Sequence, residues 1–487
     1  MDNRIWGTVG YAGFEGTLGG KEMKFGSGLY QFSPDGKHFE FLAPTTNNTW
    51  GLGFTEEFDV FLSTANNEHS DHYAIPDRLY ALAGLNEKGI EKIDGHYAMH
   101  VVTKNLRQVD VHGGFTAAAG HTPYTARAFP QEYWNRVAFV CEPTGRIIHN
   151  AILEPRGSGF EERDGWNFVA SADEWFGPVQ AEVGPDGALW LLDWYNFIIQ
   201  HNPTPEGFEN GPGNAYIDSL REYTRGRIYR VAYKDAPRYK PMELSPDDPR
   251  ELVRALQHSN MFWRLTAQRL LVESGNRDMA GRLCDLVRNR ELDEAGINAG
   301  AMHALWTLHG LGLLNGSDTE AAKVALEALD HPAAGVRKAA VQVLPREAKT
   351  LEALLGSGVL NDKDLRVRLA ALLSIAELPP STAAGKALYE AAKQPENAED
   401  KWIAHALLIA AKVNRAGFMA EYGKGGGATG SLDMEASLVD RIAAGDRMKV
   451  FPFNKWTTVR SQNLPDIAGR EISITADVRL PAAAEER

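Results

Sequence analysis

The 487-residue chain has few cysteines and no long apolar run, and both absences narrow its class. Cys141 and Cys284 are the only two cysteines, and each lies in a short apolar segment, so we expect buried free thiols. The sequence contains no Cys-x-x-Cys-His, which excludes the usual covalent attachment of a c-type haem in this chain. No stretch approaches the roughly 18 apolar residues of a membrane-spanning helix, so no transmembrane segment is expected.

Positive charge is also in deficit. The chain has 51 Lys and Arg against 64 Asp and Glu, which gives a net charge of −13. Because an acidic protein repels phosphate backbones, the net charge argues against nucleic-acid binding as its main function. The sequence also lacks the Gly-x-Gly-x-x-Gly and Gly-x-Ser-x-Gly motifs, which argues against a nicotinamide-binding fold and an α/β-hydrolase.

The two ends of the chain carry few of the usual terminal signals. Residues 1–7 lack the basic segment and apolar core of a signal peptide and resemble the interior of a β-rich domain. Residues 471–480 have the pattern of a strand with no partner after it. We therefore expect a fragment truncated at both ends.

Residues 1–235 are rich in glycine, aromatics and short apolar runs bounded by turn residues, as in all-β domains. The tripeptides 34–36 and 185–187 both read Pro-Asp-Gly and predict turns, each followed by a strand, at 39–42 and 188–192. Further strands are predicted at 60–63 and 137–140. Recurring units of this kind favour an incomplete β-propeller over a sandwich.

Residues 245–420 have a different, helical pattern. Apolar residues recur at i, i+4, i+7 and i+8 in segments that start at positions 263, 297, 336, 367 and 402. This spacing predicts one helical hairpin per repeat, in a HEAT- or armadillo-like α-solenoid. An arginine follows the first apolar position three times, as Arg264, Arg337 and Arg368, and we expect it to link adjacent turns. A glycine-rich linker at 423–448 and the start of a jelly-roll-like β domain at 449–487 complete the predicted multidomain β and α architecture.

Four polar clusters of the β region are candidate binding sites: 45–51 with 65–78, 110–127, 171–176 and 193–202. Sugar hydroxyls pair with carboxylates, amides and guanidinium groups, and sugar rings stack on aromatics. The alternative is that these residues fill turns and cap blades. The candidate substrate-binding residues are Asn66, Asn67, Arg78, Asp173, Trp175, Asp193, Tyr195, Asn196 and His201.

Histidines supply the candidates for catalysis and for metal binding. His112 and His121 lie among glycines and are candidate general bases, with Arg127 beside them in the sequence. His69, Asp71 and His72 share one segment and have the side chains of a metal site, but their spacing fixes neither a metal nor a full ligand set. Structural roles remain the alternative for all of these histidines.

Several motifs resemble a known family. Residues 107–121 (RQVDVHGGFTAAAGH), 124–127 (YTAR), 175–179 (WFGPV), 193–196 (DWYN) and 226–231 (GRIYRV) are similar to large secreted proteins of planctomycetes and verrucomicrobia described as membrane-bound dehydrogenases. In that family a propeller similar to those of quinoprotein glucose and sorbosone dehydrogenases precedes HEAT repeats. Many members add a c-type cytochrome domain, and some add a jelly-roll domain of the laminin-G or 3-keto-disaccharide hydrolase type. Residues 468–474 resemble the start of such a jelly-roll domain.

The resemblance implies a periplasmic or extracellular protein that acts on a sugar, with pyrroloquinoline quinone and calcium as cofactors and a cytochrome domain or protein as electron acceptor. In the quinoprotein mechanism a histidine base removes the hydroxyl proton, and arginine and lysine hold the quinone carboxylates. His112, His121, Arg127 and Arg78 are chemically suited to such roles, but no motif match assigns them one by one. The leading hypothesis is a quinoprotein-like sugar dehydrogenase module with a solenoid scaffold. Its alternatives are a non-catalytic carbohydrate-binding scaffold and a hydrolase or lyase whose activity resides in the C-terminal domain.

Overall fold

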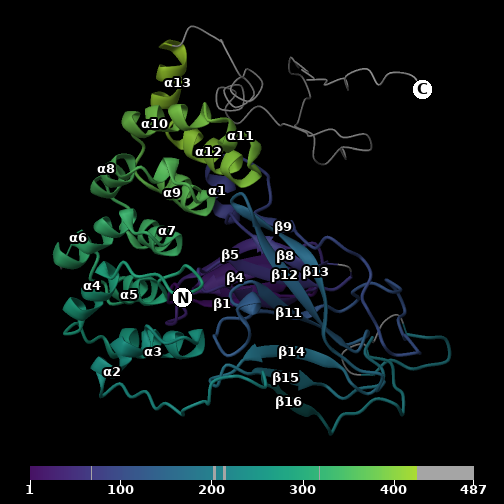
Figure 1. Cartoon of the computed structure of the whole chain (residues 1–487). Coiled ribbons are helices and arrows are strands. Elements are labelled where there is room, and N and C mark those ends of the chain that lie inside the picture. Colours follow the sequence, from purple (N-terminus) through teal and green to yellow (C-terminus); the bar gives the residue numbers. More distant parts are fainter. Residues whose placement is uncertain (67, 201–203, 212–214, 317–318, 425–487) are drawn as a thin grey trace, which may run out of the picture.

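The computed structural model describes residues 1–66, 68–200, 204–211, 215–316 and 319–424. All its β-sheets lie in the N-terminal part and nearly all its helices follow them, so the predicted β region followed by an α region is confirmed (Figure 1). Asn67, His201 and the predicted β domain at 449–487 lie outside the described residues, as does the predicted linker apart from residues 423 and 424. Within the described part of the chain, no helix is long and apolar enough to cross a membrane.

The strands form antiparallel sheets that follow one another along the chain. The sheets have the strand orders β1-β4-β5, β2-β3, β6-β7-β8-β9, β10-β11-β12-β13 and β14-β15-β16. The strands are β1 (Ile5–Val9), β2 (Phe14–Leu18), β3 (Lys21–Phe25), β4 (Gly28–Phe32), β5 (Phe39–Pro44), β6 (Thr49–Phe54), β7 (Val60–Thr64), β8 (Glu68–Tyr73), β9 (Ile90–Lys92), β10 (Ala119–Pro123), β11 (Val137–Glu142), β12 (Ile147–Arg156), β13 (Gly159–Ala170), β14 (Pro178–Val183), β15 (Leu189–Asp193) and β16 (Arg227–Val231).

Consecutive sheets pack through their first strands, with β1 against β6, β6 against β10, and β10 against β14. The approach of β6 to β10 depends on glycine. A Cβ added at Gly53 would lie 1.7 Å from the carbonyl oxygen of His121, and one at Gly51 would lie 2.8 Å from the His121 nitrogen. Any larger residue at these two positions would push the second and third large sheets apart.

Both predicted Pro-Asp-Gly turns form. The N–H groups of Gly36 and Gly187 donate to the carbonyls of Ser33 and Gly184 at 2.8 and 2.9 Å. The φ angles of the two glycines are 70° and 73°, in the left-handed region that glycine adopts without strain. The strands predicted after these turns are β5 and β15, and the other two predicted strands are β7 and β11.

The helices form two rows. The helices α3, α5, α7, α9 and α12 pack on one another in series beside the sheets, and α4, α6, α8 and α10 lie outside them (Figure 1). The helices are α1 (Asp77–Leu82), α2 (Pro249–Ala255), α3 (Met261–Ser274), α4 (Ala280–Arg288), α5 (Ala299–Gly310), α6 (Thr319–Glu327), α7 (Ala334–Val343), α8 (Ala348–Ser357), α9 (Leu365–Glu377), α10 (Thr382–Ala392), α11 (Pro395–Glu399), α12 (Lys401–Val413) and α13 (Arg415–Lys424), with 3₁₀ turns at Gln131–Tyr133, Ala328–Asp330 and Val359–Asn361.

The five predicted apolar patterns fall on the inner row, where their alanines are buried. Two of the three predicted arginine links also form. Arg337 donates to both carboxylate oxygens of Asp362 at 2.6 and 2.7 Å, and Arg368 donates to Asn397 at 2.8 Å. In both cases the partner lies in the next turn along the row. Arg264 instead reaches across to the sheets and pairs with Glu56.

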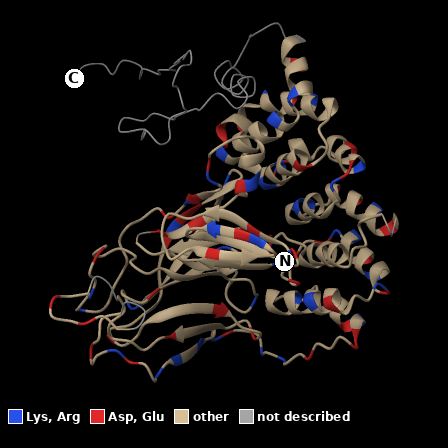
Figure 2. Ribbon diagram, turned by 180° about the vertical axis from the view of Figure 1, so that it is seen from behind, with Lys and Arg blue, Asp and Glu red and all other residues tan. Residues whose placement is uncertain are grey.

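Opposite charges hold the helix row against the sheets. At its centre the sheet side contributes acids and the helix side bases: Glu56 pairs with Arg264, and Asp59 pairs with Lys338 at 2.6 Å and with Arg366 at 3.1 Å. Arg127 pairs with Asp293 in the opposite sense. Elsewhere on the molecule acidic and basic residues are interspersed (Figure 2). The junction is therefore a buried, charge-paired interface, and it fixes the sheets in position relative to the helices.

Candidate metal centre

Three histidines and one glutamate converge between the second and third large sheets. The donor atoms of His69, His96, His149 and Glu162 all lie within 4.8 Å of one another. The Nε2 atoms of His69, His96 and His149 lie 3.4, 3.6 and 3.2 Å from the carboxylate oxygens of Glu162. Among the residues that the structure describes, this is the one group of three or more such side chains with the geometry to hold a metal ion.

Each ligand candidate comes from a different segment. His69 lies on β8, His96 follows β9, His149 lies on β12, and Glu162 lies on β13. The pairing of β12 with β13 shifts register on both sides of His149, which marks a β-bulge at the site. Bulges commonly occur beside functional sites because they redirect a side chain that a regular strand would point elsewhere.

The other ring nitrogen of each histidine faces an oxygen atom. His96 Nδ1 lies 3.0 Å from the Ala98 carbonyl, and His69 Nδ1 lies 3.2 Å from Asp94. His149 Nδ1 lies 3.9 Å from Asp164. An Nδ1–H directed at a carbonyl or carboxylate leaves the lone pair on Nε2, which is then the atom free to bind a metal ion.

The cluster is buried and its polar atoms are poorly satisfied by protein partners. The side chains of His69, His149 and Glu162 have at most 1% of their surface exposed. Neither ring nitrogen of His69 has a well-aligned hydrogen bond, and the same holds for both carboxylate oxygens of Asp94. Because buried polar groups are normally hydrogen-bonded, a group of orphaned atoms around one point fits a site for a bound ligand such as a cation.

The pKa values of the cluster reflect the same demand for positive charge. Burial opposes protonation of His69 and His96, but Asp94 and Glu162 outweigh it at His69, and Glu162 outweighs it at His96, so the pKa of each histidine is raised. Burial lowers the pKa of His149 to about 4. Burial also favours the neutral form of Glu162, yet the three histidines hold its pKa below the usual range. A divalent cation supplies the positive charge that this carboxylate otherwise takes from protons.

Phe115 forms an apolar wall of the site. Its ring stacks on His69 with centroids 4.2 Å apart and meets His149 edge-on at 5.4 Å. Gln108 positions the loop before it, because its side chain donates to the Gly114 carbonyl at 2.9 Å and accepts from the Gly113 N–H at 2.7 Å. The conspicuous sequence around His112 therefore serves to place Phe115 beside the cluster.

Only one of the three residues that the sequence indicated as metal candidates belongs to the cluster. His69 belongs to the cluster, while Asp71 and His72 do not. His72 is buried between the rings of Phe61 and Phe160, at 5.4 and 5.0 Å, and burial lowers its pKa to about 4. Its role in the described structure is packing.

The predicted catalytic residues do not converge. His112 lies on an exposed loop, where its carbonyl accepts from Tyr97. His121 is fully buried, contacts Ser70 at 3.0 Å, and has its pKa lowered to about 3 by burial. Arg127 pairs with Glu56 at 2.6 Å and with Asp293 at 2.9 Å in the junction with the helices.

Most of the predicted sugar-binding residues of the last sheet do lie together, around Arg227. Asp193 pairs with Arg227 at 2.6 Å and accepts from the N–H groups of Gly177 and Tyr195, while Tyr195 lies under the guanidinium carbon at 4.2 Å. Their neighbours are Asp173, which pairs with Arg227 at 3.3 Å, Trp175, stacked on Tyr195, and Asn196, bonded to the Glu222 carbonyl. The group caps the end of the sheet and is largely satisfied internally.

The two remaining candidates lie apart from both groups. Asn66 is exposed in the turn between β7 and β8, with a left-handed φ of 62°. Arg78 on α1 pairs with Glu40 at 2.6 Å and with Glu377 on α9, so it forms part of the junction with the helices.

Sequence reasoning missed His96, His149 and Glu162 because no local motif contains them. His149 is 53 residues from His96 and 13 from Glu162, and neither interval matches a metal-binding spacing. The available signal was a histidine at the end of the apolar run Ile147-Ile148-His149. A polar residue in a strand that is otherwise buried needs a partner, but the sequence does not reveal which one.

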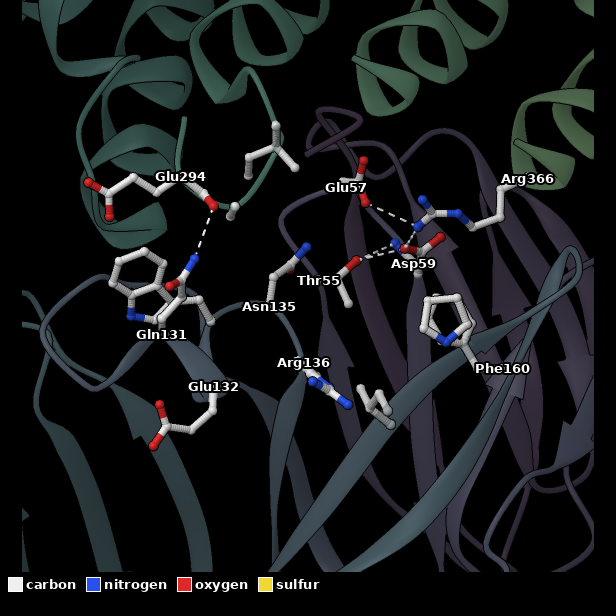
Figure 3. Close-up of a pocket in the computed structure, with 15 residues that line it drawn as sticks. Thr55, Glu57, Asp59, Gln131, Glu132, Asn135, Arg136, Phe160, Glu294 and Arg366 are labelled. Carbon is white, nitrogen blue, oxygen red and sulfur yellow. Dashed lines mark hydrogen bonds and ion pairs between the residues drawn. The ribbon is translucent and has the colours of Figure 1, made fainter. Parts of the chain in front are cut away.

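A separate cavity lies away from the cluster, at the junction of sheets and helices. It has a volume of about 630 Å³ and is lined by Glu57, Asp59, Phe160 and Arg366 among others (Figure 3). Arg366 pairs with Glu57 and Asp59, each at 3.1 Å, so these charged side chains of the lining already have partners within the protein. The histidine cluster, with its convergent and unsatisfied donors, is the stronger candidate for a functional site.

Comparisons with known proteins give a family model and a weakly similar solved structure. Residues 1–235 match the model of a domain of unknown function, DUF7133. No curated protein matches the chain. A solved structure from Thermus thermophilus, assigned as an oxidoreductase (glucose dehydrogenase), is similar at 14% identity with a TM-score of 0.24. The similar part covers 42% of this chain and about half, 55%, of that one. A likeness this weak carries no argument about function.

Proposed function

We propose that this chain is a metalloprotein that holds one transition-metal ion through His69, His96, His149 and Glu162. The observation that carries the proposal is the convergence of three imidazole Nε2 atoms and a carboxylate within 4.8 Å, each imidazole having an oxygen near its Nδ1. Imidazole suits zinc, copper, iron and nickel, whereas calcium prefers a shell made only of oxygens.

The position of the cluster indicates what the ion can do. Such an ion acts as a Lewis acid that lowers the pKa of a bound water or hydroxyl group. The His96 side chain, 18% exposed, forms the one partly open edge of the four, so a ligand can approach there. His69, His149 and Phe115 close the remaining sides and exclude water.

Metal analysis of the purified full chain tests the proposal. After removal of metal and dialysis against zinc, manganese, iron(II), nickel or copper(II), the wild type is expected to retain one equivalent of at least one ion. Loss of an imidazole ligand in His149→Ala, or of charge in Glu162→Gln, is expected to abolish or strongly weaken retention. His38→Ala, which removes an exposed histidine, is the matched control. Equal retention by His149→Ala and the control would contradict the proposal.

Two finer statements about the fold belong to the same proposal. The serial packing of β1, β6, β10 and β14 supports an incomplete propeller in which these strands face the axis. The serial packing of the inner helices and the arginine links of Arg337 and Arg368 support a HEAT-type solenoid. We propose that the solenoid acts as a scaffold for the sheets.

Quinone-dependent sugar oxidation in the periplasm or outside the cell is a second candidate, supported by the resemblance of residues 107–121 and the other motifs. The residues expected to hold pyrroloquinoline quinone do not fit a shared site, because Arg78 and Arg127 are engaged in ion pairs and His121 is sealed. We therefore derive no step through the quinone. Its test is a titration with quinone and calcium followed by dye reduction on a sugar panel. Saturable binding with sugar-dependent reduction would support it, along with an electron-accepting cytochrome partner. Sugar binding without quinone binding would favour a carbohydrate-binding scaffold.

A further inference from the structure

An exposed tryptophan lies beside the open edge of the candidate metal centre. The Trp166 side chain on β13 is 61% exposed, and its ring stacks on His100 with centroids 3.4 Å apart and planes 16° from parallel. His100 in turn stacks with His96 at 6.3 Å and 15°. Three nearly parallel rings therefore lead from a metal ligand to an indole at the surface.

The backbone at Trp166 is built to present this ring. Its φ is 64°, a left-handed conformation that is rare and strained for a bulky residue. The conformation arises in the bulge opposite His149, where a Cβ on Gly165 would lie 2.6 Å from the Asn150 carbonyl. Asp164 locks it by accepting from the Trp166 N–H at 2.8 Å. Strain of this kind persists only where the surroundings enforce it, and it clusters at binding sites.

Asp164 connects the platform to the cluster. One of its oxygens bonds His100 Nε2 at 2.6 Å, and the other lies 3.9 Å from His149 Nδ1. The Asn167 side chain donates to the His100 carbonyl and fixes that residue from the other side. The platform and the metal ligands thus share one carboxylate and one stretch of β13.

The chemistry of this surface selects a class of ligand. An exposed indole face binds the apolar face of a sugar ring, and a partly exposed carboxylate and imidazole at its side bind hydroxyl groups. The exposed fractions of Asp164 and His100 are 29% and 21%, so both remain reachable. The His100 ring stacks with the rings of both Trp166 and His96. A sugar ring on the outer face of Trp166 therefore lies further from the metal centre than the His96 side chain does.

We propose that Trp166, His100 and Asp164 form a saccharide subsite at the mouth of the metal centre, and that its ligand is an oligosaccharide rather than a single sugar. This inference rests on the proposed metal centre for the identity of the mouth. One sugar unit stacks on Trp166, and the chain continues toward the His96 edge. Trp166 is a positioning residue in this arrangement and contacts no metal.

Calorimetric titration of the full chain with cellotetraose, chitotetraose, maltotetraose and glucose tests the subsite. Wild type is expected to bind one of the tetrasaccharides more tightly than glucose. Trp166→Ala is expected to weaken that binding about tenfold or more, while Trp166→Phe restores most of it. Trp50→Ala, which removes a tryptophan 48% exposed on another sheet, is the matched control and is expected to bind like the wild type.

Metal content separates failure of the subsite from failure of the metal centre. Trp166→Ala is expected to retain metal like the wild type, and His149→Ala is expected to lose it. If neither the wild type nor any variant retains metal, but tetrasaccharide binding still depends on Trp166, the result supports the subsite and contradicts the metal centre. Absence of binding to every saccharide of the panel, or equal binding by wild type and Trp166→Ala, would overturn the subsite.

Discussion

Glu56 is a fully buried carboxylate between the sheets and the helix row. It pairs with Arg264, whose side chain is 1% exposed, and with Arg127 at 2.6 Å. Buried charges are tolerated only when they are paired, because removing one partner leaves the other in a medium that cannot solvate it. The junction therefore depends on a small number of individual charged side chains.

Glu56→Ala is expected to lower the free energy of unfolding by about 3–5 kcal/mol, since it strands the Arg264 guanidinium. Urea denaturation followed by circular dichroism measures the change. Glu15→Ala breaks a pair with Lys24 in which both side chains are more than two-thirds exposed, and it is expected to change stability by less than about 0.5 kcal/mol. Similar effects of the two substitutions on the free energy of unfolding would show that water solvates the charged groups of the junction.

His303 makes stability depend on pH. Its Nδ1 lies 2.7 Å from the side-chain oxygen of Gln268, its Nε2 has no partner, and burial holds its pKa well below the usual value. A lowered folded pKa means that the unfolded state takes up the proton first. Stability is therefore intact above about pH 6.5, the usual histidine pKa, and declines as the pH falls below it.

His303→Asn keeps a donor toward Gln268 and removes the titrating ring. Between pH 6.5 and 5, its unfolding free energy is expected to fall less steeply than that of the wild type, by up to about 1.4 kcal/mol per pH unit. Parallel curves from urea denaturation at each pH would mean that His303 has the same pKa in the folded and unfolded states. His72 and His121 have the same sign of shift and remain in both proteins, so they cancel in the comparison.

The sequence predicts a helix, strand or turn correctly where a single periodic or turn pattern determines that element. Alanine and leucine at helical spacing place the inner-row helices near their observed positions, and Pro-Asp-Gly turns place β5 and β15. These signals suffice because burial of one face is the main force on each element. The long strands β12 and β13 were missed, since their side chains alternate poorly around the bulge at His149.

Two helical glycines allow the effect of close helix packing on stability to be distinguished from the effect of helix propensity. A Cβ on Gly385 of α10 would lie 2.3 Å from the backbone nitrogen of Phe418, so Gly385→Ala is expected to push α10 and α13 apart and to destabilise by about 1–3 kcal/mol. Gly356 of α8 has nothing within 4 Å of the added Cβ, so Gly356→Ala is expected to stabilise by about 0.5–1 kcal/mol. Thermal unfolding compares them, and opposite signs are predicted. If both substitutions destabilise the protein, the loss of stability arises within the helices and not from the contact between α10 and α13.

The candidate metal centre belongs to the whole molecule, because it exists only once two sheets have packed. His69 comes from the second large sheet and His149 and Glu162 from the third, while His96 lies on the connection between them. Sequence reasoning reached His69 and the Gly113-Gly114-Phe115 segment as separate features. It could not join them, since the distances depend on tertiary packing and not on spacing along the chain.

A bound ion is expected to stabilise the packing of these two sheets. At a free metal concentration about 100 times the dissociation constant, binding adds about 2.7 kcal/mol to the free energy of unfolding. Chelation should therefore lower the melting temperature of the wild type and leave that of His149→Ala unchanged. Asp94→Asn, which removes the carboxylate beside His69, is expected to weaken metal affinity about 10- to 100-fold. A chelator effect equal in wild type and His149→Ala would place the responsible ion elsewhere.

The most direct test is anomalous X-ray diffraction from crystals of the metal-loaded full chain, recorded on both sides of the absorption edge of the retained ion. The proposed function predicts one strong anomalous peak, bonded to the Nε2 atoms of His69, His96 and His149 and to a carboxylate oxygen of Glu162, at about 2.0–2.2 Å. A peak coordinated by other residues, or none in protein that binds metal in solution, would contradict it.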